Sequence, residues 1–226
     1  MLSGHTNVLI TGVSRGIGLA TAELFLSMNP TLDYNVIGID VEDCPSTLKS
    51  NKYYTHHICD VRGELPDIEN VHILINNAGV QNSGSDIDIN LKGTINCTEK
   101  YGLQPDIKAI VNVASVSAHN GAEFPEYCAS KGGMLAYTVN TAKRVAKFYA
   151  TCNSISPGGV LTELNAPVMN DYNKWSAIMN ETPLQKWASS KEIAQWVYFV
   201  SVINNSMTGQ DIIIDNGEMI NHKFIW

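Results

Sequence analysis

The chain has 226 residues and a formal charge of −7, with 15 lysines and arginines against 22 aspartates and glutamates. This length predicts one domain with a substantial core. The excess of acidic residues argues against nucleic acid or an anionic membrane as the main partner.

Compartment and membrane topology are also constrained by the sequence. No apolar run approaches the roughly 20 residues of a membrane span. The N-terminal sequence M-L-S-G-H-T-N enters the first predicted strand at once, which argues against a signal peptide. Five scattered cysteines, an odd number, fit a reducing environment. We therefore expect a cytoplasmic protein.

The first predicted strand, at about 7–11, runs into a glycine-rich turn with the sequence T-G-V-S-R-G-I-G, and a helix follows at about 16–28. Strand, glycine-rich turn and helix in this order form a site for a nucleotide phosphate, because free backbone N–H groups lie at the helix N-terminus. The glycine spacing is wider than in the G-x-G-x-x-G fingerprint. A tight turn without a ligand is therefore an alternative interpretation.

The second predicted strand, at about 35–40, ends in Asp40. A carboxylate here can accept hydrogen bonds from the hydroxyls of an adenosine ribose. It would repel a 2′-phosphate by about 4 kcal/mol at a separation of about 4 Å. This predicts NAD(H) rather than NADP(H). Two alternatives stay open, because Arg15 in the turn could reach a 2′-phosphate and Asp40 could simply end a strand.

The remaining apolar runs alternate with helical patterns along the chain. Strands are expected near 53–59, 72–76, 108–114, 150–156 and 211–214, and helices near 90–101, 125–148 and 190–204. Such alternation predicts a parallel sheet covered on both faces. We expect an α/β fold: a single doubly wound, Rossmann-type domain over residues 1–226 with about seven strands. The short stretch between residues 60 and 72 predicts that the third helix is truncated or lost.

Tyr127 and Lys131, in the run Y-C-A-S-K, lie four residues apart and share one face of the predicted helix. A phenol has a reference pKa near 10 and is a poor acid or base at neutral pH. A nearby ammonium favours the phenolate and lowers that pKa. The pair therefore suits general acid–base chemistry, although the spacing alone is a weak signal.

Taken in order, these motifs resemble the short-chain dehydrogenase/reductase family, with T-G-x-x-x-G-x-G and Y-x-x-x-K elements, from Val8 to Gly217. The resemblance implies a cofactor site formed by Thr11, Gly12, Ser14, Arg15, Gly16, Ile17, Gly18, Asp40, Asp60, Val61, Asn77, Ala78, Gly79, Tyr127, Lys131, Pro157, Gly158, Val160 and Thr162. We expect no metal site. His56 and His57 do not suggest one, because adjacent residues on a strand face opposite sides and no second ligand pair stands at a metal-binding spacing.

The resemblance also implies a catalytic set of Asn90, Ser115, Tyr127 and Lys131. Tyr127 would be the general acid or base on the substrate oxygen. Ser115 would hydrogen-bond that oxygen, and Lys131 would lower the Tyr127 pKa and bind the nicotinamide ribose. Asn90 would help to link Lys131 to solvent.

The sequence also suggests which residues surround the substrate. We expect a lid at about 160–186 and pocket-wall residues at Ser117, His119, Phe124, Met169 and Trp175. The apolar residues of the lid predict a partly hydrophobic pocket, but they fit equally well with packing on the body or across a subunit interface.

We expect an NAD(H)-dependent oxidoreductase acting on a small or medium secondary alcohol or ketone, assembled as a homodimer or homotetramer. The resemblance implies that the helix near 90–101 helps to form a subunit interface. The stretch that leads into this helix is short here, which weakens the case for a family-like tetramer. The alternatives are an NADP(H)-dependent carbonyl reductase and a non-catalytic dinucleotide-binding regulatory protein.

Overall fold

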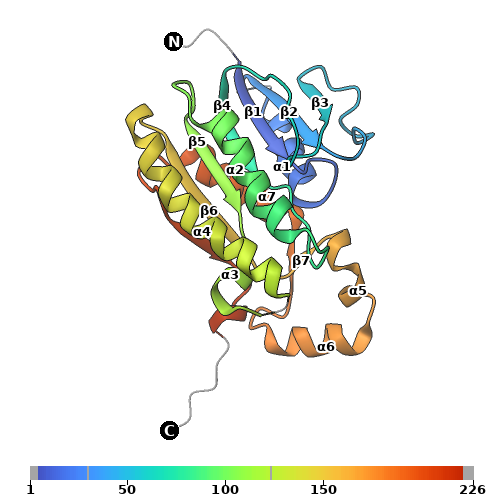
Figure 1. The fold of residues 1–226 in the computed structure, drawn as a ribbon. Coiled ribbons are helices and arrows are strands. Elements are labelled where there is room, and N and C mark those ends of the chain that lie inside the picture. The colour runs from blue at the N-terminus through green and yellow to red at the C-terminus, as the bar shows by residue number, and fades with distance from the viewer. Residues whose placement is uncertain (1–4, 30, 123, 221–226) are drawn as a thin grey trace.

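The computed structural model of the chain describes residues 5–29, 31–122 and 124–220. Its centre is a seven-stranded sheet with the strand order β3-β2-β1-β4-β5-β6-β9 (Figure 1). Every neighbouring pair in this sheet is parallel. The strands are β1 (Thr6–Thr11), β2 (Tyr34–Asp40), β3 (Tyr54–Ile58), β4 (Val71–Asn76), β5 (Ala109–Val113), β6 (Thr151–Pro157) and β9 (Asp211–Ile214). The order reverses beside β1, so the predicted doubly wound Rossmann-type sheet is confirmed.

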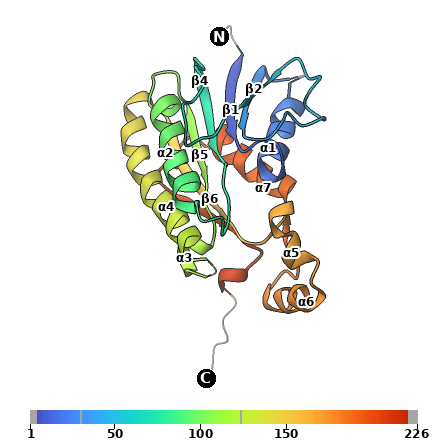
Figure 2. The ribbon, with the colours of Figure 1, turned by 45° about the vertical axis from the view of Figure 1, so that its right-hand side comes forward.

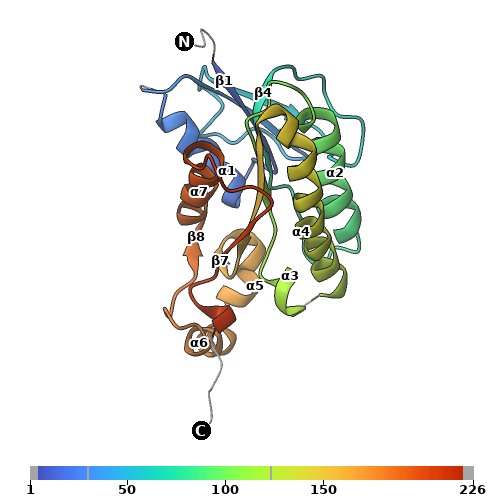
Figure 3. The same cartoon turned by 90° about the vertical axis from the view of Figure 1, so that its left-hand side faces the viewer.

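Helices cover both faces of this sheet (Figure 3). One face carries α1 (Gly16–Ser27) and α7 (Ser190–Tyr198), which ends in the π-helical turn η5 (Phe199–Ile203). The other carries α4 (Pro125–Val145), which continues into η3 (Ala146–Phe148), and a long helix made of η1 (Ile87–Lys92), α2 (Gly93–Cys97) and η2 (Thr98–Gly102). A short helix, α3 (Ser117–Asn120), follows β5. Within the described ranges, no helix is both long and apolar enough to cross a membrane.

The expected lid forms a small helical unit below the carboxyl ends of the strands (Figure 2). It contains η4 (Glu163–Asn165), α5 (Ala166–Met169) and α6 (Tyr172–Glu181). The short parallel strands β7 (Val160–Leu161) and β8 (Ala188–Ser189) pair with each other at its base. This pairing joins the two ends of the segment, and η6 (Glu218–Ile220) follows β9 near the end of the described chain.

The segment between β3 and β4 contains no helix, as its length predicts. Side chains of the long helix hold this segment instead. Asn96 Nδ2 donates to the carbonyls of Val61 and Gly63, at 2.8 and 3.1 Å. The Tyr101 hydroxyl donates to the Pro66 carbonyl at 2.7 Å. The shortened connection therefore stays ordered beside the sheet.

Asn216, just before η6, has a φ of +55°. Asparagine is among the few residues that adopt this left-handed conformation readily.

A buried amide network ties three elements of the site together. Asn76 on β4 donates from Nδ2 to Asn112 Oδ1 on β5 at 2.9 Å. Asn112 Nδ2 donates to Thr138 Oγ1 on α4 at 2.8 Å. All three residues are almost fully buried. Because buried polar groups are stable only when paired, this network fixes the spacing between two strands and a helix.

Asn112→Ala should lower the free energy of unfolding by about 2–3 kcal/mol, because it breaks the buried network and leaves a small cavity. Urea denaturation followed by circular dichroism measures this difference. Asn173→Ala, on the exposed side of α6, is the matched control. A loss no larger than that of the control would show that the network does not stabilise the fold.

Candidate active site

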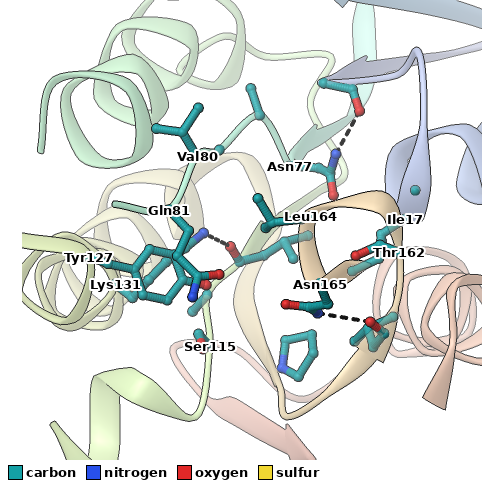
Figure 4. Close-up of a pocket in the computed structure, with 18 of the residues that line it drawn as sticks. Ile17, Asn77, Val80, Gln81, Ser115, Tyr127, Lys131, Thr162, Leu164 and Asn165 are labelled. Carbon is teal, nitrogen blue, oxygen red and sulfur yellow. Dashed lines mark hydrogen bonds between the residues drawn. The ribbon is translucent and has the colours of Figure 1, made fainter. Parts of the chain in front are cut away.

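A cavity of about 730 Å³ opens at the carboxyl ends of the strands. Figure 4 shows Ser115, Tyr127 and Lys131 on one side and Ile17, Asn77 and Thr162 on the other, with Leu164 and Asn165 between. The predicted residues that line it are Gly12, Arg15, Gly16, Ile17, Asp40, Asp60, Val61, Asn77, Ala78, Gly79, Ser115, Ser117, Tyr127, Lys131, Pro157, Gly158, Val160 and Thr162. Four further predicted residues do not line it: Thr11, Ser14, Gly18 and Asn90.

The turn after β1 has room for no side chain at two of its glycines. Gly12 has a φ of +68°, and a Cβ there would lie 2.7 Å from the Ala78 Cα. A Cβ on Gly18 would lie 2.0 Å from the Gly12 carbonyl oxygen. Both positions therefore require glycine, which brings the backbone of the turn against the loop after β4.

Thr11 and Asn77 bond these two loops to each other. Thr11 Oγ1 accepts hydrogen bonds from the N–H groups of Asn77 and Ala78, at 3.1 and 3.0 Å. Asn77 Nδ2 donates to the carbonyls of Thr11 and Gly12, at 3.1 and 2.8 Å. The ends of β1 and β4 therefore form one rigid wall of the cavity.

The N-terminus of α1 faces this wall. The twelve-residue helix has no side-chain cap at its N-terminus and no acidic residue in its first turn. Its first N–H groups and the positive end of its dipole are therefore suited to a phosphate. Together with the glycine backbone and the size of the cavity, this fits a dinucleotide.

The edge of the cavity at β2 is acidic. Asp40 Oδ2 accepts from the Ser14 N–H at 2.8 Å, and its Oδ1 accepts from the Glu42 N–H at 3.1 Å. Arg15 Nη1 lies 2.7 Å from Glu42 Oε1. Arg15, which could have received a 2′-phosphate, is thus paired with a carboxylate in this structure.

Asp60, at the end of the β3 loop, is held by Arg62. The Arg62 guanidinium donates to both carboxylate oxygens, with the shortest distance 2.6 Å from Nη2 to Oδ2. These hydrogen bonds are the main reason why the pKa of Asp60 lies below its ordinary value. This end of the cavity therefore carries an ion pair.

Lys131 and Tyr127 lie together on α4, one turn apart. The Lys131 Nζ is 5.7 Å from the centroid of the Tyr127 ring and donates to the Val113 carbonyl at 2.8 Å. Burial lowers the pKa of Lys131 to about 8, and the nearby Asp86 carboxylate partly opposes this effect. The ammonium is therefore easier to deprotonate than an ordinary lysine.

Ser115 follows β5 and faces the same part of the cavity. Its Oγ donates to Ser117 Oγ at 3.3 Å and accepts from the Ser117 N–H at 3.2 Å. The Val116 N–H donates to the Pro157 carbonyl at 3.0 Å, which ties this loop to the end of β6. Ser117 therefore orients Ser115 as well as lining the cavity.

Asn90 lies behind the cavity and is fully buried in the π-helical turn η1. Its side chain exchanges hydrogen bonds with the backbone of Val80, at 2.8 and 2.9 Å. Its Nδ2 also donates to Ser130 Oγ at 3.0 Å, and that hydroxyl donates to the Tyr127 carbonyl at 2.7 Å. Its side chain thus connects the loop after β4 to α4. Single π turns often occur at functional sites.

The structure brings only Ser117, of the five expected substrate residues, to the cavity wall; His119, Phe124, Met169 and Trp175 do not line it. His119 instead pairs with Asp211 on β9, with Nε2 2.7 Å from Oδ2. Trp175 packs its ring edge-to-face on Trp187 at 5.1 Å, and Trp187 does line the cavity. Trp175 therefore contacts the cavity wall through Trp187 and does not line the cavity itself.

The lining contains further residues beyond the predicted site residues. Those within the expected lid are Glu163, Leu164, Asn165, Ala177, Ile178, Glu181 and Thr182. Those outside it, which the sequence analysis missed, include Val80, Gln81, Trp187 and Glu218. The helical spacing was a usable signal here, because Ala177 and Ile178 lie four and three residues before Glu181, so each can share a face of α6 with it. Trp187 and Glu218 have no local signal, because tertiary packing alone brings them to the cavity.

The sequence is similar to those of known oxidoreductases over most of its length. The family model described as Enoyl-(Acyl carrier protein) reductase matches residues 12–218. The chain is 28% identical to the 3-oxoacyl-(acyl-carrier-protein) reductase FabG of Chlamydia pneumoniae, over 93% of this chain and 95% of the relative. It is 29% identical to Carbonyl reductase family member 4 of Xenopus tropicalis, over 92% and 95% of the two chains.

Solved structures are similar over almost their whole length. The ligand-free aldohexose dehydrogenase of Thermoplasma acidophilum has a TM-score of 0.81 at 25% identity, covering 98% of this chain and 97% of that one. A 4-hydroxyisoleucine dehydrogenase complexed with NADH has a TM-score of 0.82 at 25% identity, covering 96% and 100%. A tyrosine-to-phenylalanine variant of ElxO with NADPH bound has a TM-score of 0.79 at 25% identity, with the same coverage. The chain belongs to the short-chain dehydrogenase/reductase family of oxidoreductases.

Proposed function

We propose that the protein is an NAD(H)-dependent oxidoreductase that interconverts a small or medium secondary alcohol and the matching ketone. The observation that carries this proposal is the convergence of Ser115, Tyr127 and Lys131 on the cavity that the glycine turn also lines. The glycine turn lies about 110 residues earlier in the chain, so only the fold brings these groups together.

When bound, the dinucleotide supplies the hydride chemistry, while the protein supplies position and electrostatics. Tyr127 exchanges a proton with the substrate oxygen as general acid or base. Ser115 donates a hydrogen bond to the same oxygen and stabilises the charge that develops there. Lys131 favours the ionised form of Tyr127 through its charge, and Asn90 helps to fix α4 relative to the loop after β4.

The preference for NAD(H) rests on the charges at the end of β2. Asp40 lines the cavity, and Arg15 is paired with Glu42 rather than open to a phosphate. Similar proteins do not decide the matter, because structures with NADH and with NADPH are both among those at 25% identity. An NADP(H)-dependent carbonyl reductase is the second candidate, favoured by the place of Arg15 in the cavity lining.

A non-catalytic dinucleotide-binding regulatory protein is the less favoured candidate. Such a protein would not need a serine, a tyrosine and a buried lysine on one cavity wall.

We also propose a cytoplasmic location and a homodimeric or homotetrameric assembly. All five cysteines are free thiols, which supports a reducing compartment.

Tyr127→Phe should bind NADH as the unmodified protein does but lose about 10²–10⁴-fold in kcat, because it removes the group that transfers the proton. Calorimetric titration measures binding, and absorbance of the reduced nicotinamide with a ketone panel measures turnover. Tyr137→Phe, whose hydroxyl bonds to Glu99 on the outer side of α4, is the matched control. Wild-type rates in Tyr127→Phe would contradict the proposed mechanism.

Asp40→Ala should raise the affinity for NADPH about 10–100-fold, because it removes a like charge near the 2′-phosphate. The affinity for NADH should fall, since the hydrogen bonds to the ribose are lost. Asp43→Ala, which removes a charge outside the cavity lining, controls for net charge. An unchanged NADPH affinity in Asp40→Ala would instead favour the NADP(H) alternative that uses Arg15.

The lowered pKa of Lys131 has a consequence for stability in the absence of cofactor. Between the folded pKa of about 8 and the unfolded value of 10.5, the unfolded chain binds the extra proton. Stability contributed by this group should therefore rise with pH across that window, by about 3 kcal/mol in total.

Chemical denaturation of the wild type and of Lys131→Met between pH 7 and 10 isolates this effect. The difference in the free energy of unfolding, wild type minus variant, should increase with pH. A difference that stays constant would show that Lys131 keeps an ordinary pKa in the folded protein.

A further inference from the structure

A histidine–aspartate pair lies on the short helix that follows the catalytic serine. His119 is the third residue of α3, and its Nε2 lies 2.7 Å from Oδ2 of Asp211, the first residue of β9. The two side chains are 28% and 15% exposed, so the contact between them is largely shielded from water. Neither residue belongs to the described cavity lining. The mechanism proposed above gives this pair no role.

The Asp211 carboxylate is oriented from the sheet side as well. Its Oδ1 accepts hydrogen bonds from Ser154 Oγ at 2.6 Å and from Ser156 Oγ at 3.0 Å. Both serines are buried on β6, the strand that pairs with β9. Because an ionised carboxylate only accepts, His119 donates from Nε2, which both the neutral ring with its hydrogen on Nε2 and the cation can do. The edge of the sheet therefore presents an oriented acceptor to α3.

The helix α3 depends on such contacts, because it has only four residues and so short a helix is marginal by itself. It lies at the lower end of α4 (Figures 1 and 3). At its start, the Val116 N–H donates to the Pro157 carbonyl at 3.0 Å. Near its end, Asn120 Nδ2 has an exposed contact of 3.5 Å with the Met219 sulfur, which is a weak acceptor. The bond from His119 is the stronger anchor of this end.

The first turn of α3 holds the catalytic serine. The Ser117 N–H donates to Ser115 Oγ at 3.2 Å, and the Ala118 N–H donates to the Ser115 carbonyl at 3.0 Å. A shift of α3 would therefore move the groups that orient Ser115 Oγ. Misplacing a reacting group by about 1 Å can lower a rate about 100-fold, even when the cause lies outside the site.

We propose that His119 and Asp211 are positioning residues for the reaction: their hydrogen bond holds α3 in the place where its first turn orients Ser115. The inference rests on the proposed oxidoreductase function. It assigns a role to two residues that do not contact the cavity, and that role is exerted through Ser115. The pair should therefore affect turnover and leave the binding of the dinucleotide unchanged.

His119→Ala removes the donor and should lower kcat about tenfold, with the affinity for NADH unchanged. His119→Gln keeps an N–H donor near the position of Nε2 and should recover most of the lost rate. His5→Ala is the matched control, because it breaks a second His–Asp pair, His5 Nδ1 to Asp33 Oδ1 at 3.3 Å, at the start of β1. The control should keep the rate of the unmodified protein. Turnover of the ketone panel and calorimetric titration with NADH measure the two effects separately.

A double-variant cycle tests whether His119 acts through the serine. Ser115→Ala alone should lower kcat about 100-fold, because it removes the hydrogen bond to the substrate oxygen. When Ser115 is already absent, adding His119→Ala should lower kcat by less than about twofold more, since residues that act as one unit are not additive. A further tenfold loss in the double variant would show an action independent of Ser115 and would contradict the proposal.

Hydrogen exchange gives a readout that does not depend on turnover. In the protein without cofactor, the amides of residues 115–121 should exchange about tenfold faster in His119→Ala than in the unmodified protein, and at the unmodified rate in His119→Gln. Unchanged exchange, or an unchanged kcat in His119→Ala, would overturn the inference while the proposed function stands. If the unmodified protein turned over no compound of the panel, the proposed function would fall and this inference with it.

Discussion

The contact between the turn after β1 and the loop after β4 is the constraint on which the site depends. Gly12 has no space for a side chain against Ala78, and Thr11 and Asn77 bond the two loops in both directions. This contact fixes the wall against which a dinucleotide would lie. Any side chain at Gly12 or Gly18 would move that wall, so the Gly-rich sequence is a packing requirement as well as a means to expose N–H groups.

The second wall is positioned by polar groups inside the protein. Asn76, Asn112 and Thr138 connect β4 to β5 and α4, and Asn90 connects the loop after β4 to α4 through Ser130. These bonds hold Ser115 and Lys131, which come from different elements, at one end of the cavity. Burying the Lys131 ammonium is unfavourable in itself, and these bonds stabilise the fold that keeps this cation near Tyr127.

Much of this arrangement follows from sequence because it rests on local rules. Continuous apolar runs such as Ala109–Val113 are typical of buried parallel strands, and the turn Thr11–Gly18 and the pair Tyr127–Lys131 have fixed spacings. The substrate wall follows no such rule. Trp187 and Glu218 reach the cavity through the β7–β8 pairing and through the turn after β9, respectively. Trp175 packs on Trp187 but does not line the cavity. The π-helical turn around Asn90 also has no local signature, since its sequence suits an ordinary helix.

The central claim is that this cavity binds NAD(H) through the turn after β1, with Asp40 at the ribose. Calorimetric titration of the unmodified protein with NADH and with NADPH tests it most directly. We predict saturable binding of NADH at one site per chain, at least about tenfold tighter than NADPH, as expected for one repelled phosphate near a carboxylate. Tighter binding of NADPH would contradict the role given to Asp40, and no binding of either would contradict the assignment of the cavity itself.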